Sequence, residues 1–166
     1  MRAPQRIDNK KTQEIASLLV PLSNRLLLLP NVSVAEIVPA TPVFPVDSAP
    51  EWYLGSCIWR EQKVPLVSFE ALLGEEVVKI DKGTRFAVLN TTGLSEDLGF
   101  IALSTQGIPR LARVNEEEIT TRDVDNKPFE LMHVSWAGED AVIPDVRAIE
   151  QVLLDFYASN LQSTDF

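Results

Sequence analysis

The 166-residue chain is 45% hydrophobic and 23% charged, a composition typical of a globular protein and a length typical of one domain. Its net charge of −9 argues against binding to nucleic acid or anionic lipid, because their phosphate groups would be repelled. One cysteine cannot form an internal disulfide, and no stretch is apolar enough for a signal peptide or membrane span, so we expect a cytoplasmic protein without direct membrane insertion.

The N-terminal part of the chain predicts a polar tail followed by a hairpin. Residues 1–13 are polar, and we expect them to be a disordered tail. Apolar runs over 15–20 and 26–29, with turn residues between them, are typical of two paired strands. Asn31 is a good helix N-cap, so one helical turn is expected over 32–37.

A proline-rich crossing and a second hairpin come next. Four prolines between 39 and 50 predict a stiff connection within one domain rather than a linker between domains. The stretch YLGSCIWREQKVPLVSF at 53–69 predicts two strands joined by a tight polar turn in the charged segment 61–63, with Trp59 and Arg60 at its edge. A helical turn over 69–73, ended by Gly74, closes this hairpin.

The remainder of the chain predicts more strands and a closing helix. Strands are expected at 86–90, 99–103, 108–114, 129–136 and 141–143. Pro144 and Asp145 suit the first turn of a helix, whose apolar face runs from Val146 to Phe156. We therefore expect an all-β domain over 14–156, built as two small linked barrels with a short C-terminal helix, and a tail over 157–166.

Residues for catalysis or metal binding are scarce in this sequence. His133 is the only histidine, and in a strand its neighbour Ser135 cannot be assumed to reach it as a nucleophile. One cysteine and one histidine cannot form a zinc site, and there is no calcium loop or glycine-rich phosphate loop. Cys57 lies in an apolar run and is expected to be a core residue. These features favour a binding module without cofactors over an enzyme. A small β-barrel hydrolase stays an alternative, which a pocket enclosing His133 with an acid would support.

The 53–69 stretch resembles the signature of the CheW-like adaptor domain. That signature is a glycine, four residues, Arg-Gly, three residues and a proline; Gly55, Arg60 and Pro65 stand at these places, followed by Val67 and Phe69 of the alternating strand. Upstream, residues 34–37 read Val-Ala-Glu-Ile, similar to the family's short Val-x-Glu-Ile segment, and the likeness extends over about residues 14–156. Three positions depart from the family: Ile58 replaces the usual Asn, Glu61 the usual Gly, and Ser68 the usual Asp.

The resemblance implies two SH3-like five-stranded barrels and a non-enzymatic role. A CheW-like adaptor links the regulatory domain of a CheA-type histidine kinase to the cytoplasmic tip of methyl-accepting chemoreceptors in a signalling array. The chain resembles a divergent member of the family, similar to the adaptors of the pilus systems that control type IV pilus twitching motility. A stand-alone relative of the kinase regulatory domain, competing with adaptors, is a further alternative. By resemblance, Val34 and Glu36 contact the kinase, while Gly55 and Arg60 lie in a receptor groove between the barrels.

Four expectations follow for individual side chains. Arg60 and Trp59 are a typical pair of interface anchors, with the alternative that Arg60 links the two barrels internally by bonding loop carbonyls. Glu61 tolerates a left-handed conformation poorly, so the turn should be longer or differently registered than the family's. Phe44, in the proline-rich crossing, is a candidate partner contact if it is exposed, and otherwise covers the core. The same two alternatives hold for Trp52.

Overall fold

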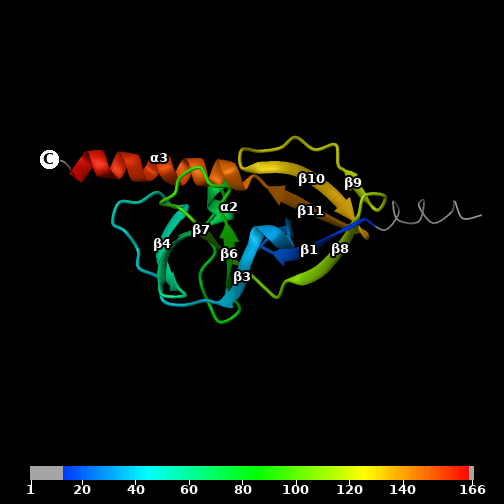
Figure 1. The fold of residues 1–166 in the computed structure, drawn as a ribbon, viewed down its shortest axis with the longest axis horizontal. Helices are drawn as coiled ribbons and strands as arrows, with labels where there is room; N and C mark the ends of the chain where they lie inside the picture. Colours follow the sequence, from blue (N-terminus) through cyan, green and yellow to red (C-terminus); the bar gives the residue numbers. More distant parts are fainter. Residues whose placement is uncertain (1–12, 165–166) are drawn as a thin grey trace, which may run out of the picture.

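Two β-sheets lie side by side, and a long C-terminal helix extends from the end of the six-stranded sheet along the five-stranded one (Figure 1). This architecture is seen in a computed structural model, which describes residues 13–164, except for the side chains of 161–164. In spatial order, the six-stranded sheet contains β8 (Arg110–Asn115), β1 (Glu14–Pro21), β2 (Leu26–Pro30), β11 (Glu139–Pro144), β10 (Glu130–Trp136) and β9 (Ile119–Thr121). The five-stranded sheet contains β3 (Val34–Pro39), β6 (Arg85–Asn90), β7 (Phe100–Thr105), β5 (Gln62–Val67) and β4 (Tyr53–Trp59). The helical segments are η1 (Asn31–Ser33), α2 (Phe69–Leu72) and α3 (Val146–Thr164).

The predicted fold class, mostly β with two subdomains and a closing helix, is confirmed. The six-stranded sheet has one strand more than expected, because the three-residue β9 is too short to show an alternating pattern in the sequence. The middle of the chain forms the five-stranded sheet, while β1 and β2 join β8 to β11 in the other one. A parallel contact between Val142 and Leu27 connects the C-terminal hairpin to the N-terminal hairpin.

The two sheets share a hydrophobic core with α3. Leu27 of the six-stranded sheet, Leu103 of the five-stranded sheet and Ile149 of α3 belong to this core, and all three are at most 1% exposed. Each sheet also has a smaller apolar cluster of its own, around Phe86 in one and Leu19 in the other. The shared core makes the two subdomains one folding unit.

The expected helical turn over residues 32–37 is wrong. Only η1 is helical there, and residues 34–39 form β3, which pairs with β6 through Ile37 and Ala87. Val34, Ile37 and Val38 are β-branched residues that lose rotamer freedom in a helix and fit a pleated strand. The N-cap preference of Asn31 was therefore outweighed by strand pairing.

The C-terminal helix starts as expected but continues past Phe156. Asp145 precedes it and accepts a hydrogen bond from the Ala148 amide at 3.1 Å, as an N-cap residue does. The helix then continues to Thr164, beyond the expected end of the domain. Tyr157 explains part of the extension, because its ring packs edge-on against Tyr53 with centroids 6.1 Å apart. The expected N-terminal tail, apart from residue 13, lies outside the described residues.

A polar contact joins the two subdomains through side chains outside the strands. Arg25, in the turn before β2, donates a hydrogen bond to Glu75 Oε1 at 2.9 Å and makes a second, shorter contact with Oε2. Glu75 lies just after α2, in the part of the chain that forms the five-stranded sheet. The Arg25 guanidinium lowers the pKa of the Glu75 carboxyl from its ordinary value of 4.5. An arginine does link the subdomains, but it is Arg25 and not Arg60.

This link should make stability depend on acid pH. Because the pKa of Glu75 is lower in the folded state, its stabilisation is fully present above about pH 4.5 and is lost as the pH falls through the lowered pKa. We expect Glu75→Gln to cost about 1 kcal/mol of unfolding free energy at pH 7, and the difference from wild type to shrink below pH 4. Urea unfolding between pH 3 and 7 measures this difference in unfolding free energy, with the exposed Glu76→Gln as control. A pH-independent difference would contradict the prediction.

Candidate functional site

The β4–β5 hairpin ends in a two-residue turn made by Arg60 and Glu61. Trp59 pairs with Gln62 across the turn, and Arg60 and Glu61 have positive φ angles of 48° and 63°. This is the geometry of a type I′ turn, so the prediction of a longer or shifted turn is wrong. Pairing of the buried Cys57 with the buried Val64 sets the register, and slipping it by one residue would turn core side chains outward. The backbone therefore accepts Glu61 in a left-handed conformation.

Relief of this strain is measurable. A non-glycine residue in the left-handed region costs about 1 kcal/mol, and glycine tolerates it freely. We expect Glu61→Gly to raise the free energy of unfolding by about 1 kcal/mol, because the Glu61 side chain is exposed and has no packing to lose. Thermal or urea unfolding checks this against Glu51→Gly, an exposed position outside the positive-φ residues. Loss of stability in Glu61→Gly would contradict the assignment of strain.

Three side chains meet beside this turn. Trp59 Nε1 donates a hydrogen bond to Glu36 Oε1 at 2.9 Å, and Arg60 Nη2 lies 3.1 Å from the same oxygen. The Arg60 guanidinium also stands 4.7 Å from the centre of the Trp59 ring, a cation–π contact. Glu36 is on β3 and Trp59 on β4, and these two strands form opposite edges of the five-stranded sheet. The triad of Glu36, Trp59 and Arg60 therefore connects the two edges of one barrel.

The burial of these residues differs from what the sequence suggested. Trp59 is only 6% exposed and packs against Phe100 with ring centroids 4.8 Å apart, so its ring does not offer a large contact area. The Arg60 side chain is 65% exposed, and its ion pair is with Glu36 in the same sheet. The alternative that Arg60 links the two barrels is wrong. Its guanidinium has five N–H donors, and at this exposure it can still bind a partner.

A groove runs between the two subdomains next to the triad. Its volume is about 360 Å³, and it is lined by Leu18, Asn31, Val34, Ala35, Glu36, Ile37 and Pro109. Leu18 and Pro109 belong to the part of the chain that forms the six-stranded sheet, and the other residues to β3 and η1. Leu111 pairs with Leu18 in the strand register and is 72% exposed, and Ile108, beside Pro109, is 71% exposed. The groove therefore combines an apolar wall with the Glu36 carboxylate.

Sequence reasoning found only half of this groove. Val34 and Glu36 were expected contacts, whereas Leu18, Pro109 and Leu111 were not. Leu111 could have been noticed, because it alternates with the core residues Ala112 and Val114 and is thus a large apolar side chain on an outward position. Its place next to the groove depends on its pairing with Leu18, a groove residue that is distant in the sequence.

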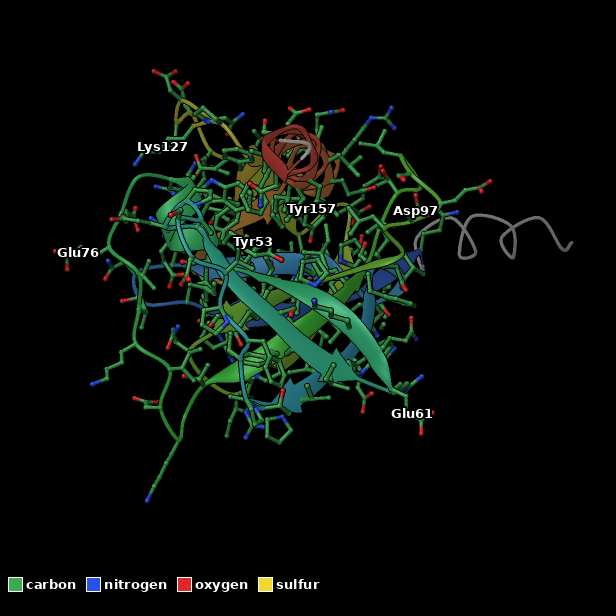
Figure 2. All side chains as sticks on the ribbon, turned by 90° about the vertical axis from the view of Figure 1, so that its left-hand side faces the viewer. Tyr53, Glu61, Glu76, Asp97, Lys127 and Tyr157 are labelled. Carbon is green, nitrogen blue, oxygen red and sulfur yellow. The ribbon has the colours of Figure 1, made fainter. Side chains whose placement is uncertain are left out.

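Gly55 on β4 lies against the backbone of Phe44 in the proline-rich crossing. Phe44 forms an isolated bridge with Ser56, and its carbonyl comes so close to Gly55 that an added Cβ would lie 2.4 Å from the oxygen. Gly55 is buried and is not among the groove's lining residues. Phe44 is 54% exposed and Val46 43%, whereas Trp52 packs on Phe156 and covers the core. Figure 2 shows Glu61 at the outer tip of the hairpin, far from Tyr53 and Tyr157.

The cavity around His133 contains the histidine and the acid that the hydrolase alternative called for. His133 Nε2 lies 2.9 Å from Glu130 Oε1, in a cavity of about 370 Å³ that Arg25, Arg122 and Lys127 also line. A histidine and an acid are thus present, but no serine, threonine or cysteine lines the cavity as a nucleophile. Glu130 is itself held by the Lys127 amide at 2.8 Å, a structural bond.

Two other observations bear on chemistry. Cys57 is 2% exposed, and burial raises its thiol pKa, which fits the expected core residue. Within residues 13–164 no group of three or more His, Cys, Asp or Glu side chains is placed to hold a metal ion.

Ser68 caps α2 by accepting a hydrogen bond from the Ala71 amide at 3.1 Å. Aspartate is an equally good cap, which accounts for Ser68 at a position where the CheW-like family usually has Asp.

Comparisons with known proteins agree with the fold. The CheW-like domain family matches residues 16–152 of the chain. Among solved structures, the crystal structure of the scaffolding protein TtCheW from Thermoanaerobacter tengcongensis is similar, with a TM-score of 0.68 and 15% sequence identity over 81% of this chain and 86% of that one. No curated protein matches the chain. No helix in the described part of the chain is long and apolar enough to cross a membrane.

The family match covers most of the domain, and the positions that carried the resemblance have structural roles. Gly55, Arg60 and Pro65 lie in the β4–β5 hairpin, and Val34 and Glu36 lie in the strand that faces it. The chain therefore belongs to the CheW-like domain family and is a non-enzymatic scaffold of chemosensory signalling.

Proposed function

We propose that this chain couples a CheA-type histidine kinase to methyl-accepting chemoreceptors, acting in the cytoplasm in a pilus chemosensory system that controls twitching motility. The observation that carries the proposal is the groove between the subdomains, bordered by the Glu36–Arg60 ion pair at 3.1 Å. An apolar groove with one carboxylate and one guanidinium at its border suits a protein partner.

The receptor tip is proposed to bind at Arg60 and on the side of this groove formed by Leu18 and Pro109, which leaves the β3 side of the groove to the kinase. A helix of the tip would place apolar side chains against Leu18 and Leu111, and a carbonyl or carboxylate against Arg60. The kinase regulatory domain is proposed to contact Val34 and Glu36 from the edge of β3. The exposed Phe44, which lies on the opposite edge of the same sheet, is a further proposed contact. Gly55 supports this surface by allowing the backbone of residue 44 to approach β4.

Co-purification with each partner tests the assignment of residues. The bait is the full chain, and the partners are the kinase regulatory domain and a receptor cytoplasmic fragment from the same organism. We expect Arg60→Ala to weaken receptor binding and Val34→Asp to weaken kinase binding, each by about tenfold or more, because such positions act as interface anchors. Arg147→Ala, an exposed change on α3, is the control. Unchanged binding by both variants would remove the assignment.

Whether the two partners bind at the same time separates a coupler from a competitor. A coupler holds kinase and receptor in one complex, whereas a stand-alone relative of the kinase regulatory domain excludes an adaptor from the kinase. Size-exclusion chromatography of the three-component mixture distinguishes them. Loss of twitching on surfaces in a strain without this chain tests the pilus assignment separately.

A further inference from the structure

We infer that Trp59 is a positioning residue that fixes Glu36 and Arg60 for partner binding, and is not itself a contact. This inference rests on the proposed function, because it concerns the same docking surface. Trp59 is only 6% exposed, yet its Nε1 donates a hydrogen bond to the Glu36 carboxylate at 2.9 Å. The centre of its ring lies 4.7 Å from the Arg60 guanidinium. Trp59 therefore touches both charged side chains while a partner could reach little of it.

The exposure of the charged pair shows why a third residue is needed. The Arg60 and Glu36 side chains are 65% and 42% exposed, and an ion pair this open to solvent holds its geometry weakly. The indole is rigid, because it packs against Phe100 inside the barrel. A buried donor bonded to a half-exposed carboxylate orients that carboxylate, and the carboxylate stays accessible to a partner.

The location of the contact adds to the argument. β3 and β4 are the two edge strands of the five-stranded sheet, and Trp59 bonds across them. Val34, Glu36 and Ile37 on β3 line the groove. The Trp59–Glu36 hydrogen bond thus fixes the groove wall relative to the hairpin that carries Arg60. The packing of Trp59 inside the barrel therefore orients Glu36 and Arg60 on the surface.

The substitution Trp59→Phe isolates this role. Phenylalanine keeps an aromatic ring beside Phe100 and Arg60 but has no N–H, so it removes the bond to Glu36. We expect roughly tenfold weaker binding of the kinase regulatory domain, a loss in the range of a hydrogen bond to a charged group. In a Glu36→Ala background the same substitution should cause no further loss, because Trp59 acts through Glu36. Trp52→Phe, which removes an indole that has no contact with Glu36, is the matched control.

A second measurement needs no partner. The coupling between Glu36 and Arg60 is obtained from the urea unfolding of single and double alanine variants, in wild type and in Trp59→Phe. Positioning by Trp59 predicts a smaller coupling in Trp59→Phe, whereas an equal coupling would overturn the inference. Failure of wild type to bind the kinase domain would defeat the proposed function, and the coupling measurement would still decide the role of Trp59. Binding losses that simply add in the Glu36→Ala background would also overturn it.

Discussion

Gly55→Ala should lower the free energy of unfolding by about 3 kcal/mol or more. An alanine Cβ at this position would lie 2.4 Å from the carbonyl oxygen of Phe44 and 2.8 Å from the Pro45 Cα. Both atoms belong to the backbone, so no side chain can rotate away, and the crossing segment would have to move. The φ angle of Gly55 is also +131°, a conformation that side chains with a Cβ rarely adopt.

Gly93→Ala separates the two contributions. Gly93 has a φ of +90°, and nothing lies within 4 Å of an added Cβ. It should show the cost of backbone conformation alone, about 1 kcal/mol. Urea unfolding of both variants gives the difference, which measures the close approach of the crossing segment to β4. Equal costs at the two glycines would contradict the prediction. Any binding defect of Gly55→Ala should then follow from displacement of Phe44.

Glu150→Ala should have the second largest effect, a loss of about 2–3 kcal/mol. The Glu150 side chain projects from α3, is 0% exposed, and accepts hydrogen bonds from the Thr92 amide at 2.7 Å and the Leu94 amide at 3.4 Å. Alanine would leave a cavity and remove the acceptor for both amides. Because α3 follows the six-stranded sheet and residues 92–94 follow β6, this carboxylate joins the two subdomains.

Glu150→Gln tests the need for two acceptor oxygens. Glutamine has nearly the same shape, but one oxygen becomes an NH₂ group that faces a backbone donor, so we expect an intermediate loss of about 1–2 kcal/mol. Glu96→Gln, on the exposed part of the same loop, is the control. Hydrogen exchange of the Thr92 and Leu94 amides should accelerate in both Glu150 variants. Unchanged stability and exchange would show that the buried carboxylate holds nothing in place.

Local sequence patterns were sufficient where neighbours along the chain decide the structure. The hairpins 15–29 and 53–67 follow from alternating apolar residues and turn residues, and Asp145 marks the start of α3. The signature at Gly55, Arg60 and Pro65, together with residues 34–37, indicated the CheW-like family, which the match over residues 16–152 confirms. These are properties of short segments, in which side-chain type restricts the backbone directly.

Residues distant in the sequence decided what local patterns could not. Asn31 favours a helix start, but pairing with β6 made β3 a strand, and the core around Cys57 and Val64 imposed a left-handed turn on Glu61. Neighbouring residues likewise do not reveal which carboxylate pairs with each arginine. Arg25 meets Glu75 across the two sheets, while Arg60 meets Glu36 across one barrel.

The sequence by itself determined the fold class, the hairpins and the family, because these depend on periodicity and on residues a few positions apart. Tertiary structure alone decided that Trp59 is buried, that the backbone of Phe44 lies against Gly55, and that Leu18 and Val34 line the same groove. Burial and charge pairing depend on which strands become neighbours in space, and strand order is set by the packing of the whole chain.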